Sequence, residues 1–348
     1  MKIIKGKLTL TLLVFMFWSS ILNASDNFKL IQKVTFDDEV YGYFRDAIID
    51  KDNDLICSFY RTPLRMFTKE KSMTFATRGQ GPNQLTDLWT YCLYQSDLAL
   101  FEMPNKIKIF AKKNGAYVWK ETKWLKSGPY VHTPRDAIFF DDKWFVAGAN
   151  YHDLGGKGSK ISFIKIYAAD GNPLKDLIFK ESSGDTQYLH MDFFVLDCNG
   201  NVLYLPENEL KVTVIDPKEL KIIREAALET PSSYKPMPPD FYVPKRSDNP
   251  GDIMKMLEKW RFSYSRILSI AVDNGHLVLQ YRVFDDKLKK FALLFYDTGS
   301  FKLEKTIFTN DCFMTARTGK YYFYANGDPG IDEEADKCVI NVYSFEDK

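Results

Sequence analysis

The stretch Asp54-Leu-Ile-Cys-Ser-Phe59 has a counterpart in Asp97-Leu-Ala-Leu-Phe-Glu102, and this pair decides the fold. Each begins a run typical of a β-strand, and each leads over the same interval to a second strand, ending at Phe67 and Phe110. The copies are 43 residues apart without a gap, and a third copy runs from Asn201 to Val214. Because a fixed period is the signature of repeat architectures, the sequence predicts a repeated β-hairpin.

Looser copies of the hairpin fill the rest of the chain. They begin near Trp144, His276 and Tyr321, which brings the number of hairpins to six. Another strand precedes each hairpin, joined by a short turn rich in Asp, Asn and Gly, the residues that tolerate positive φ. A fourth strand follows most hairpins, as in Phe301–Phe308. The repeating unit is therefore a four-stranded antiparallel sheet.

The two ends of the chain complement each other. Phe28–Phe36 resembles the fourth strand at Phe301–Phe308, yet no hairpin precedes it, and the last hairpin, ending at Tyr343, lacks a fourth strand. The sequence thus predicts an all-β, six-bladed β-propeller with four antiparallel strands per blade, in which the N-terminal strand completes the last blade and closes the ring. A two-sheet sandwich, the alternative, explains neither the repeat nor the matching strand.

The N-terminus is typical of a secretory signal peptide over residues 1–24. Lys2, Lys5 and Lys7 precede an apolar run from Leu8 to Trp18, and a small-residue cleavage point follows at Ala24. A membrane anchor is the alternative, but the run is shorter than the roughly 18 residues of a spanning helix. No Cys follows the run, which disfavours a lipid anchor. We expect a periplasmic or secreted propeller over residues 25–348, with no membrane span after cleavage.

Composition limits the partners and the cysteine chemistry. The formal net charge is +1, with no basic run, so no nucleic-acid partner is expected. The chain has five cysteines without C-x-x-C spacing. In an exported protein an odd number leaves at least one thiol unpaired, and their spread along the chain argues against a disulfide framework and a zinc site. We expect them to be small core hydrophobes.

The stretch Gly79-Gln-Gly81-Pro82-Asn-Gln-Leu85 joins the first blade to the second. It lacks the Lys-Ser/Thr of a P-loop and the third glycine of a dinucleotide fingerprint, so we interpret it as a corner. The motif resembles the G-x-G-P-x-x-(Phe/Leu) signature of exported six-bladed propellers related to the NHL-repeat and TolB types, common in Bacteroidetes. Asn83-Gln84 and Leu85 stand where Gly-Glu and Phe are commoner. The resemblance implies fold and export, and it implies no reaction.

The long variable loops all belong to one face of the predicted disc. The longest is an insertion at about 229–265, whose end, Asp252–Phe262, reads as a short helix capped by Asn249-Pro250. Loops on a rigid scaffold are where binding usually occurs. This loop-rich face is therefore the expected functional face.

Charged residues open several inner strands on that face. Two strands share a tetrapeptide, Arg45-Asp46-Ala-Ile and Arg135-Asp136-Ala-Ile, while His190 and Asp192 open the fourth inner strand and Arg266 the fifth. Such a ring of guanidinium and carboxylate groups at the mouth of the central channel is suited to a carboxylate, a sugar or a peptide end. The competing interpretation is salt bridging between blades.

Two functions follow from this surface. The favoured one is an exported, non-catalytic propeller that binds a carbohydrate, peptide or protein at the channel mouth, without a cofactor. The alternative is a propeller enzyme, a metal-dependent lactonase, hydrolase or lyase, with calcium held by Asp46, Asp136 and Asp192. The arginines beside two of these carboxylates disfavour a cation. Asp50-Lys-Asp52-Asn-Asp54 begins like a calcium loop, but Leu55 replaces the required glycine, so we interpret it as a turn.

Overall fold

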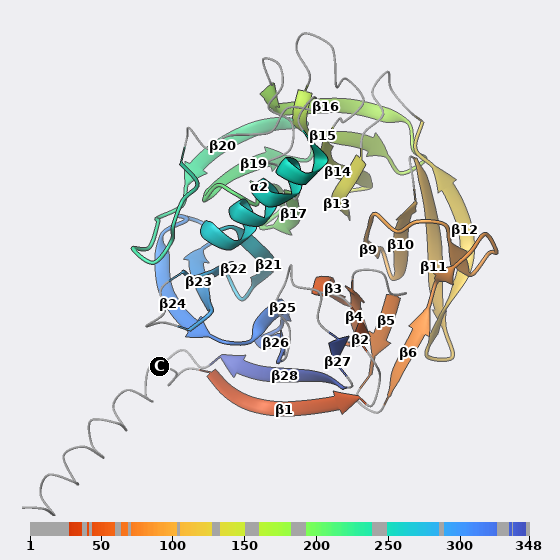
Figure 1. The fold of residues 1–348 in the computed structure, drawn as a ribbon. Helices are drawn as coiled ribbons and strands as arrows, with labels where there is room; N and C mark the ends of the chain where they lie inside the picture. Colours follow the sequence, from red (N-terminus) through yellow and green to blue (C-terminus); the bar gives the residue numbers. More distant parts are fainter. Residues whose placement is uncertain are drawn as a thin grey trace, which may run out of the picture.

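The structure is a computed structural model that describes residues 28–36, 40–41, 44–59, 64–68, 71–102, 105–126, 133–149, 160–181, 193–238, 249–284, 289–325, 334–335 and 337–345. This part of the chain forms six four-stranded antiparallel sheets arranged in a ring (Figure 1). The predicted six-bladed β-propeller is confirmed.

Each blade is numbered here from its innermost strand outward, and five blades use four consecutive strands. Blade 1 contains β3 (Phe44–Ile49), β4 (Leu55–Phe59), β5 (Leu64–Phe67) and β6 (Ser72–Phe75). Blade 2 contains β9 (Thr90–Tyr94), β10 (Asp97–Glu102), β11 (Lys106–Lys113) and β12 (Ala116–Trp124). Blade 3 contains β13 (Thr133–Phe140), β14 (Lys143–Ala149), β15 (Lys160–Ala168) and β16 (Pro173–Glu181).

Blade 4 contains β17 (Phe193–Cys198), β18 (Asn201–Pro206), β19 (Lys211–Asp216) and β20 (Lys221–Ala227). Blade 5 contains β21 (Ile267–Asp273), β22 (His276–Arg282), β23 (Phe291–Asp297) and β24 (Leu303–Thr309). Two short pairs lie outside the blades: β2 (Val40–Tyr41) with β27 (Glu334–Ala335), and β7 (Thr77–Arg78) with β8 (Gln84–Leu85).

Blade 6 joins the two ends of the chain, as predicted. It contains β25 (Cys312–Arg317), β26 (Lys320–Tyr324), β28 (Cys338–Phe345) and, as its outermost strand, β1 (Phe28–Phe36). The ladder between β1 and β28 runs from the pair Phe28–Phe345 to the pair Phe36–Cys338. The N-terminal strand therefore closes the ring.

The hairpin repeat is also visible in the strand register. Leu55 pairs with Phe67 in blade 1, and Leu98 pairs with Phe110 in blade 2, at the same offset. The third copy departs from the prediction, because Val202 pairs with Ile215 rather than with Val214. The register of this hairpin is therefore shifted by one residue, and the connection between β18 and β19 carries the fully buried Glu207.

Apolar side chains fill the spaces between neighbouring blades. One such cluster joins Cys57 of blade 1 to Cys312 and Cys338 of blade 6. All five cysteines are buried and none is in a disulfide, in agreement with the prediction that they are core residues.

The helix expected in the insertion is α2 (Pro250–Ser263), and it crosses in front of β17 in Figure 1. Its N-cap is the predicted one, because the Asn249 side chain accepts a hydrogen bond from the Gly251 N–H at 2.9 Å. No helix in the described ranges is long and apolar enough to cross a membrane. The predicted signal peptide, residues 1–24, lies outside the described residues.

The closure of the ring predicts which residue of β1 matters most for stability. The Phe28 ring lies 5.2 Å from that of Tyr321 and 5.5 Å from that of Phe345, between centroids. Because Phe28→Ala removes these contacts from a half-buried site, we expect it to lower the free energy of unfolding by roughly 2–4 kcal/mol, measured by chemical denaturation.

Leu30→Ala is the matched control, because Leu30 lies on the same strand and is 49% exposed. We expect its effect to stay within about 0.5 kcal/mol. If both variants lowered the free energy of unfolding equally, Phe28 would not be the residue of β1 that matters most for stability.

Candidate binding site at the mouth of the ring

The inner strands of the blades are neighbours around the ring axis, and they all start on the same face. The strands β3, β9, β13, β17, β21 and β25 lie next to one another in the centre (Figure 1). Each follows a blade-to-blade connection, so its first residues belong to the loop-rich face. We call these first residues and the residues directly before them the mouth.

Two arginines at the mouth sit on β-bulges. In blade 1 the register passes from the pair Phe44–Phe59 to the pair Asp46–Ser58, which leaves Arg45 without a partner across the strand. The same shift occurs around Arg135 at the start of β13. A bulge changes the direction of a side chain and is over-represented beside functional sites. The repeated tetrapeptide is therefore a repeated bulge.

The aspartates that follow these arginines bind backbone N–H groups. Asp46 Oδ1 accepts from Ala47 N at 2.7 Å, and Asp136 Oδ1 accepts from Ala137 N at 2.8 Å. Asp136 Oδ2 also accepts from Val195 N of blade 4 at 2.7 Å. These carboxylates thus help to hold the bulges and the seam between blades.

Trp89 lies between the two bulged arginines. Arg45 donates from Nη1 to the carbonyl of Leu88 at 3.1 Å and from Nη2 to that of Trp89 at 2.6 Å. From the other side, the Arg135 guanidinium lies 5.6 Å from the centre of the Trp89 ring, within cation–π range. The mouth therefore brings together side chains of blades 1, 2 and 3.

Arg266 is used differently from Arg45. Its Nη1 lies 3.1 Å from Glu207 Oε2, and the two side chains are 11% and 0% exposed. Because Glu207 belongs to blade 4 and Arg266 to blade 5, this is a buried salt bridge across a seam. It agrees with the interpretation of the charged ring as bracing between blades.

The structure brings five of the seven predicted site residues to the mouth: Arg45, Asp46, Arg135, Asp136 and Arg266. The other two, His190 and Asp192, lie outside the described residues. Sequence reasoning missed Trp89 and Glu207. The only signal for Trp89 was its place directly before an inner strand, while nothing local marks Glu207 as a partner of Arg266.

The glycine motif forms a corner between blades, as interpreted from the sequence. The Gly79 N–H donates to the Leu85 carbonyl at 2.9 Å, and a Cβ on Gly79 would come within 2.3 Å of Gln84 Oε1. Lys108 from β11 donates to the carbonyls of Gly81 and Gln84. The polar groups of the corner are satisfied within the protein, with no phosphate required.

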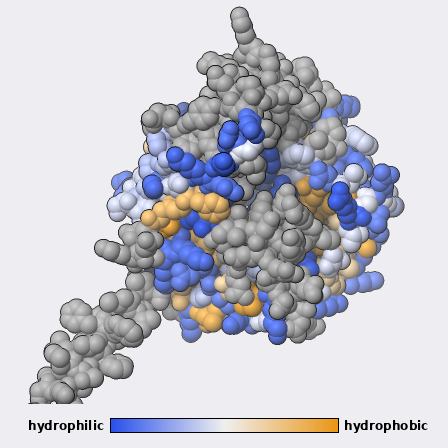
Figure 2. All heavy atoms as spheres, viewed as in Figure 1, coloured by the Kyte–Doolittle hydropathy of each residue, from blue (hydrophilic) through white to orange (hydrophobic). Residues whose placement is uncertain are grey.

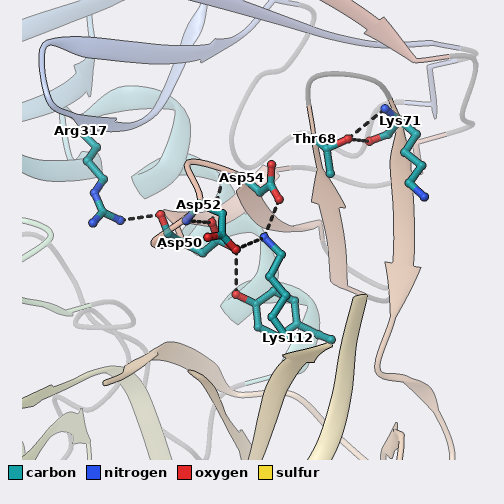
Figure 3. Close-up of polar contacts among 8 residues, drawn as sticks. Asp50, Asp52, Asp54, Thr68, Lys71, Lys112 and Arg317 are labelled. Carbon is teal, nitrogen blue, oxygen red and sulfur yellow. Dashed lines mark hydrogen bonds and ion pairs between the residues drawn. The ribbon is translucent and has the colours of Figure 1, made fainter. Parts of the chain in front are cut away.

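The turn that resembled a calcium loop holds an ammonium group instead. Lys112 Nζ lies 2.7 Å from Asp50 Oδ2, 2.9 Å from Asp52 Oδ2 and 2.6 Å from Asp54 Oδ2 (Figure 3). The Tyr117 hydroxyl also donates to Asp50 at 2.9 Å. From blade 6, Arg317 donates to the Asp50 carbonyl at 2.6 Å. This cluster lies on the plain face and joins blades 1, 2 and 6.

In the space-filling view of the loop-rich face, hydrophilic atoms predominate among the coloured residues, and apolar atoms form small separate groups (Figure 2). Among the described residues, no group of three or more His, Cys, Asp or Glu side chains is arranged to hold a metal ion. The described part of the mouth thus combines arginine, aspartate and tryptophan side chains.

Fold and site together define a six-bladed β-propeller with a polar mouth on its loop-rich face. No family model and no curated protein matches the chain. Among solved structures, a member of the DUF4221 family from Bacteroides vulgatus is similar, with 12% identity, a TM-score of 0.60, and coverage of 92% of this chain and 98% of that one. A putative exported protein from Bacteroides fragilis has 11% identity, a TM-score of 0.53, and coverage of 89% and 95%. At these identities the likeness shows the fold alone.

The ammonium in the aspartate turn predicts a pH-dependent loss of stability in Lys112→Met. Burial alone would lower the pKa of Lys112, but hydrogen bonds to Asp50, Asp54 and Asp52 outweigh it and hold this pKa above its ordinary value. The bond to Lys112 holds the pKa of Asp52 below its ordinary value. Breaking a buried ion pair costs about 3–5 kcal/mol, and we expect the lower end because Asp52 reaches solvent.

The sign of the pH dependence follows from these directions. A carboxyl whose pKa is lowered by folding contributes stability above its unfolded value of about 4 and loses it as the pH falls through the folded value. The gap between wild type and Lys112→Met, measured by urea unfolding, should therefore be full at pH 7 and shrink below about pH 4. Lys120→Met, which breaks the exposed pair with Asp97, should change little. A gap that does not change with pH would contradict the role given to the carboxylates.

Proposed function

We propose that this propeller is an exported, non-catalytic binding protein whose ligand is held at the mouth. The observation that carries the proposal is the pair of bulged arginines around Trp89, because a bulge re-aims a side chain and bulges are over-represented next to active sites. Trp and Arg are also the residues most enriched where binding energy is concentrated. The ligand classes that fit are carbohydrates, peptides and proteins.

Export is part of the proposal. The N-terminal 24 residues have the layout of a signal peptide, and a similar structure is described as a putative exported protein. The G-x-G-P-x-x-(Phe/Leu) resemblance to exported propellers of the NHL and TolB types supports the same location.

The metal-dependent enzyme is the weaker candidate. A catalytic metal site needs several ligands that converge with an open position. Asp46 and Asp136 instead accept hydrogen bonds from backbone N–H groups, and each follows an arginine whose charge opposes a cation. No calcium or other cofactor therefore enters the proposed function.

Thermal unfolding of the protein purified after expression of the full chain tests this proposal. The probes are neutral and acidic oligosaccharides, short peptides, EDTA and calcium. A ligand at 100 times its Kd adds about 2.7 kcal/mol, which moves the midpoint of a protein of this size by roughly one or two degrees or more. We expect such a shift from one ligand class and none from EDTA.

Matched variants locate the site. Arg135→Met should abolish the ligand shift, whereas Arg224→Met should keep it, because Arg224 joins blade 4 to blade 5 on the outer rim through the carbonyls of Gly299 and Ser300. A midpoint that falls with EDTA and returns with calcium would replace the proposal by the metalloenzyme. A ligand shift that survives Arg135→Met would place the site elsewhere.

A further inference from the structure

We propose that the ligand of the mouth is an acidic saccharide and that its carboxylate pairs with Arg45. This inference rests on the proposed function and goes further by naming the chemical class of the ligand and the residue that selects it. It follows from which donors and acceptors at the mouth are already used.

Among the described residues, the acceptors next to the arginines of the mouth are engaged within the protein. Both oxygens of Asp136 accept backbone N–H groups, and Asp46 Oδ1 accepts another. The Asp46 carbonyl accepts the Tyr91 hydroxyl at 2.7 Å. Glu207 is fully buried against Arg266. Asp87, exposed and two residues before Trp89, adds one carboxylate, so the described part of the mouth offers few open acceptors to a ligand.

Arg45 is the donor that remains available. It is exposed, and within the described residues its guanidinium donates to two neutral carbonyls and forms no ion pair. A guanidinium has five N–H donors in a planar fork that matches a carboxylate. Its other N–H groups therefore suit an anionic, acceptor-rich group, and charge-assisted hydrogen bonds to such a group are the strong ones.

The donors and acceptors that the mouth leaves open favour a saccharide over a peptide. Each peptide residue brings a backbone N–H that needs an acceptor, whereas a sugar hydroxyl both donates and accepts and can turn to suit the site. Trp89, beside Arg45, adds an amphipathic ring of the kind that fills binding sites. A sugar ring bearing a carboxylate fits a mouth that combines a cation, an aromatic ring and few open acceptors.

Calorimetric titration with charge-matched probes tests the inference. The pairs are trigalacturonate with its methyl ester, sialyllactose with lactose, and an acetylated tripeptide with a free or amidated C-terminus. We expect at least one acidic saccharide to bind, and its neutral match to bind about tenfold or more weakly, since a hydrogen bond to a charged group is worth about 1.5–3 kcal/mol.

Arg45→Met should remove the preference for the acidic member of the pair. The control is again Arg224→Met, because Arg224 is also exposed and also donates from both Nη atoms to two carbonyls of the next blade. Arg224→Met removes two comparable hydrogen bonds across a seam and leaves the mouth unchanged. A retained preference for the acidic member in Arg224→Met, together with a lost preference in Arg45→Met, supports the inference.

The failures of the two proposals are distinguishable. If neutral and acidic saccharides bind equally and Arg135→Met still abolishes binding, the mouth remains the site and the carboxylate inference is overturned. If only the peptide with a free C-terminus binds, the saccharide is wrong. If neither acidic saccharide binds, the inference is overturned, and the broader thermal panel decides the proposed function on its own.

Discussion

The pairing of β1 with β28 is the constraint on which the rest of the molecule depends. In this protein the ring of six sheets closes through a blade that combines the first and last strands of the described chain. That pairing carries the largest loop-closure cost in the fold, because Phe28 and Phe345 are almost the whole described chain apart. The aromatic cluster around Phe28 offsets part of this cost. Without closure, the inner strands would have no reason to gather their starts at one mouth.

Once the ring is closed, each seam between blades combines an apolar core with polar contacts near its ends. The contacts join side chains of one blade mainly to backbone groups or buried charges of the next. In order around the ring they are Lys112 with Asp50, Arg135 with Trp89, Asp136 with Val195, Arg266 with Glu207, Asp273 with Gly319, and Arg317 with Asp50. Such contacts are directional, so they set the register of neighbouring blades while apolar burial supplies most of the driving force.

The sequence predicted the strands, their repeat and the closure of the ring, and it missed individual side-chain contacts between blades. The hairpin repeat and the closing strand Phe28–Phe36 follow from strand patterns that recur along the chain, and the capped helix at Asn249 follows from a local one. Trp89 and Glu207 acquire their roles from partners on other blades. The one-residue shift in register between β18 and β19 also escaped detection, because both strands remain apolar when the alignment slips by one.

The arginines of the mouth show that a side chain can hold a seam between blades and still present its charge to a ligand. Arg266 faces a buried carboxylate, so its charge is compensated inside the protein and its role is to hold a seam. Arg45 also crosses a seam, but its acceptors are neutral carbonyls and its side chain stays exposed. Holding the seam requires only hydrogen bonds, which a bulged and exposed guanidinium supplies while keeping its charge. The bonds to Leu88 and Trp89 fix the fork in place, so an anion that meets it finds a donor whose orientation has already been set.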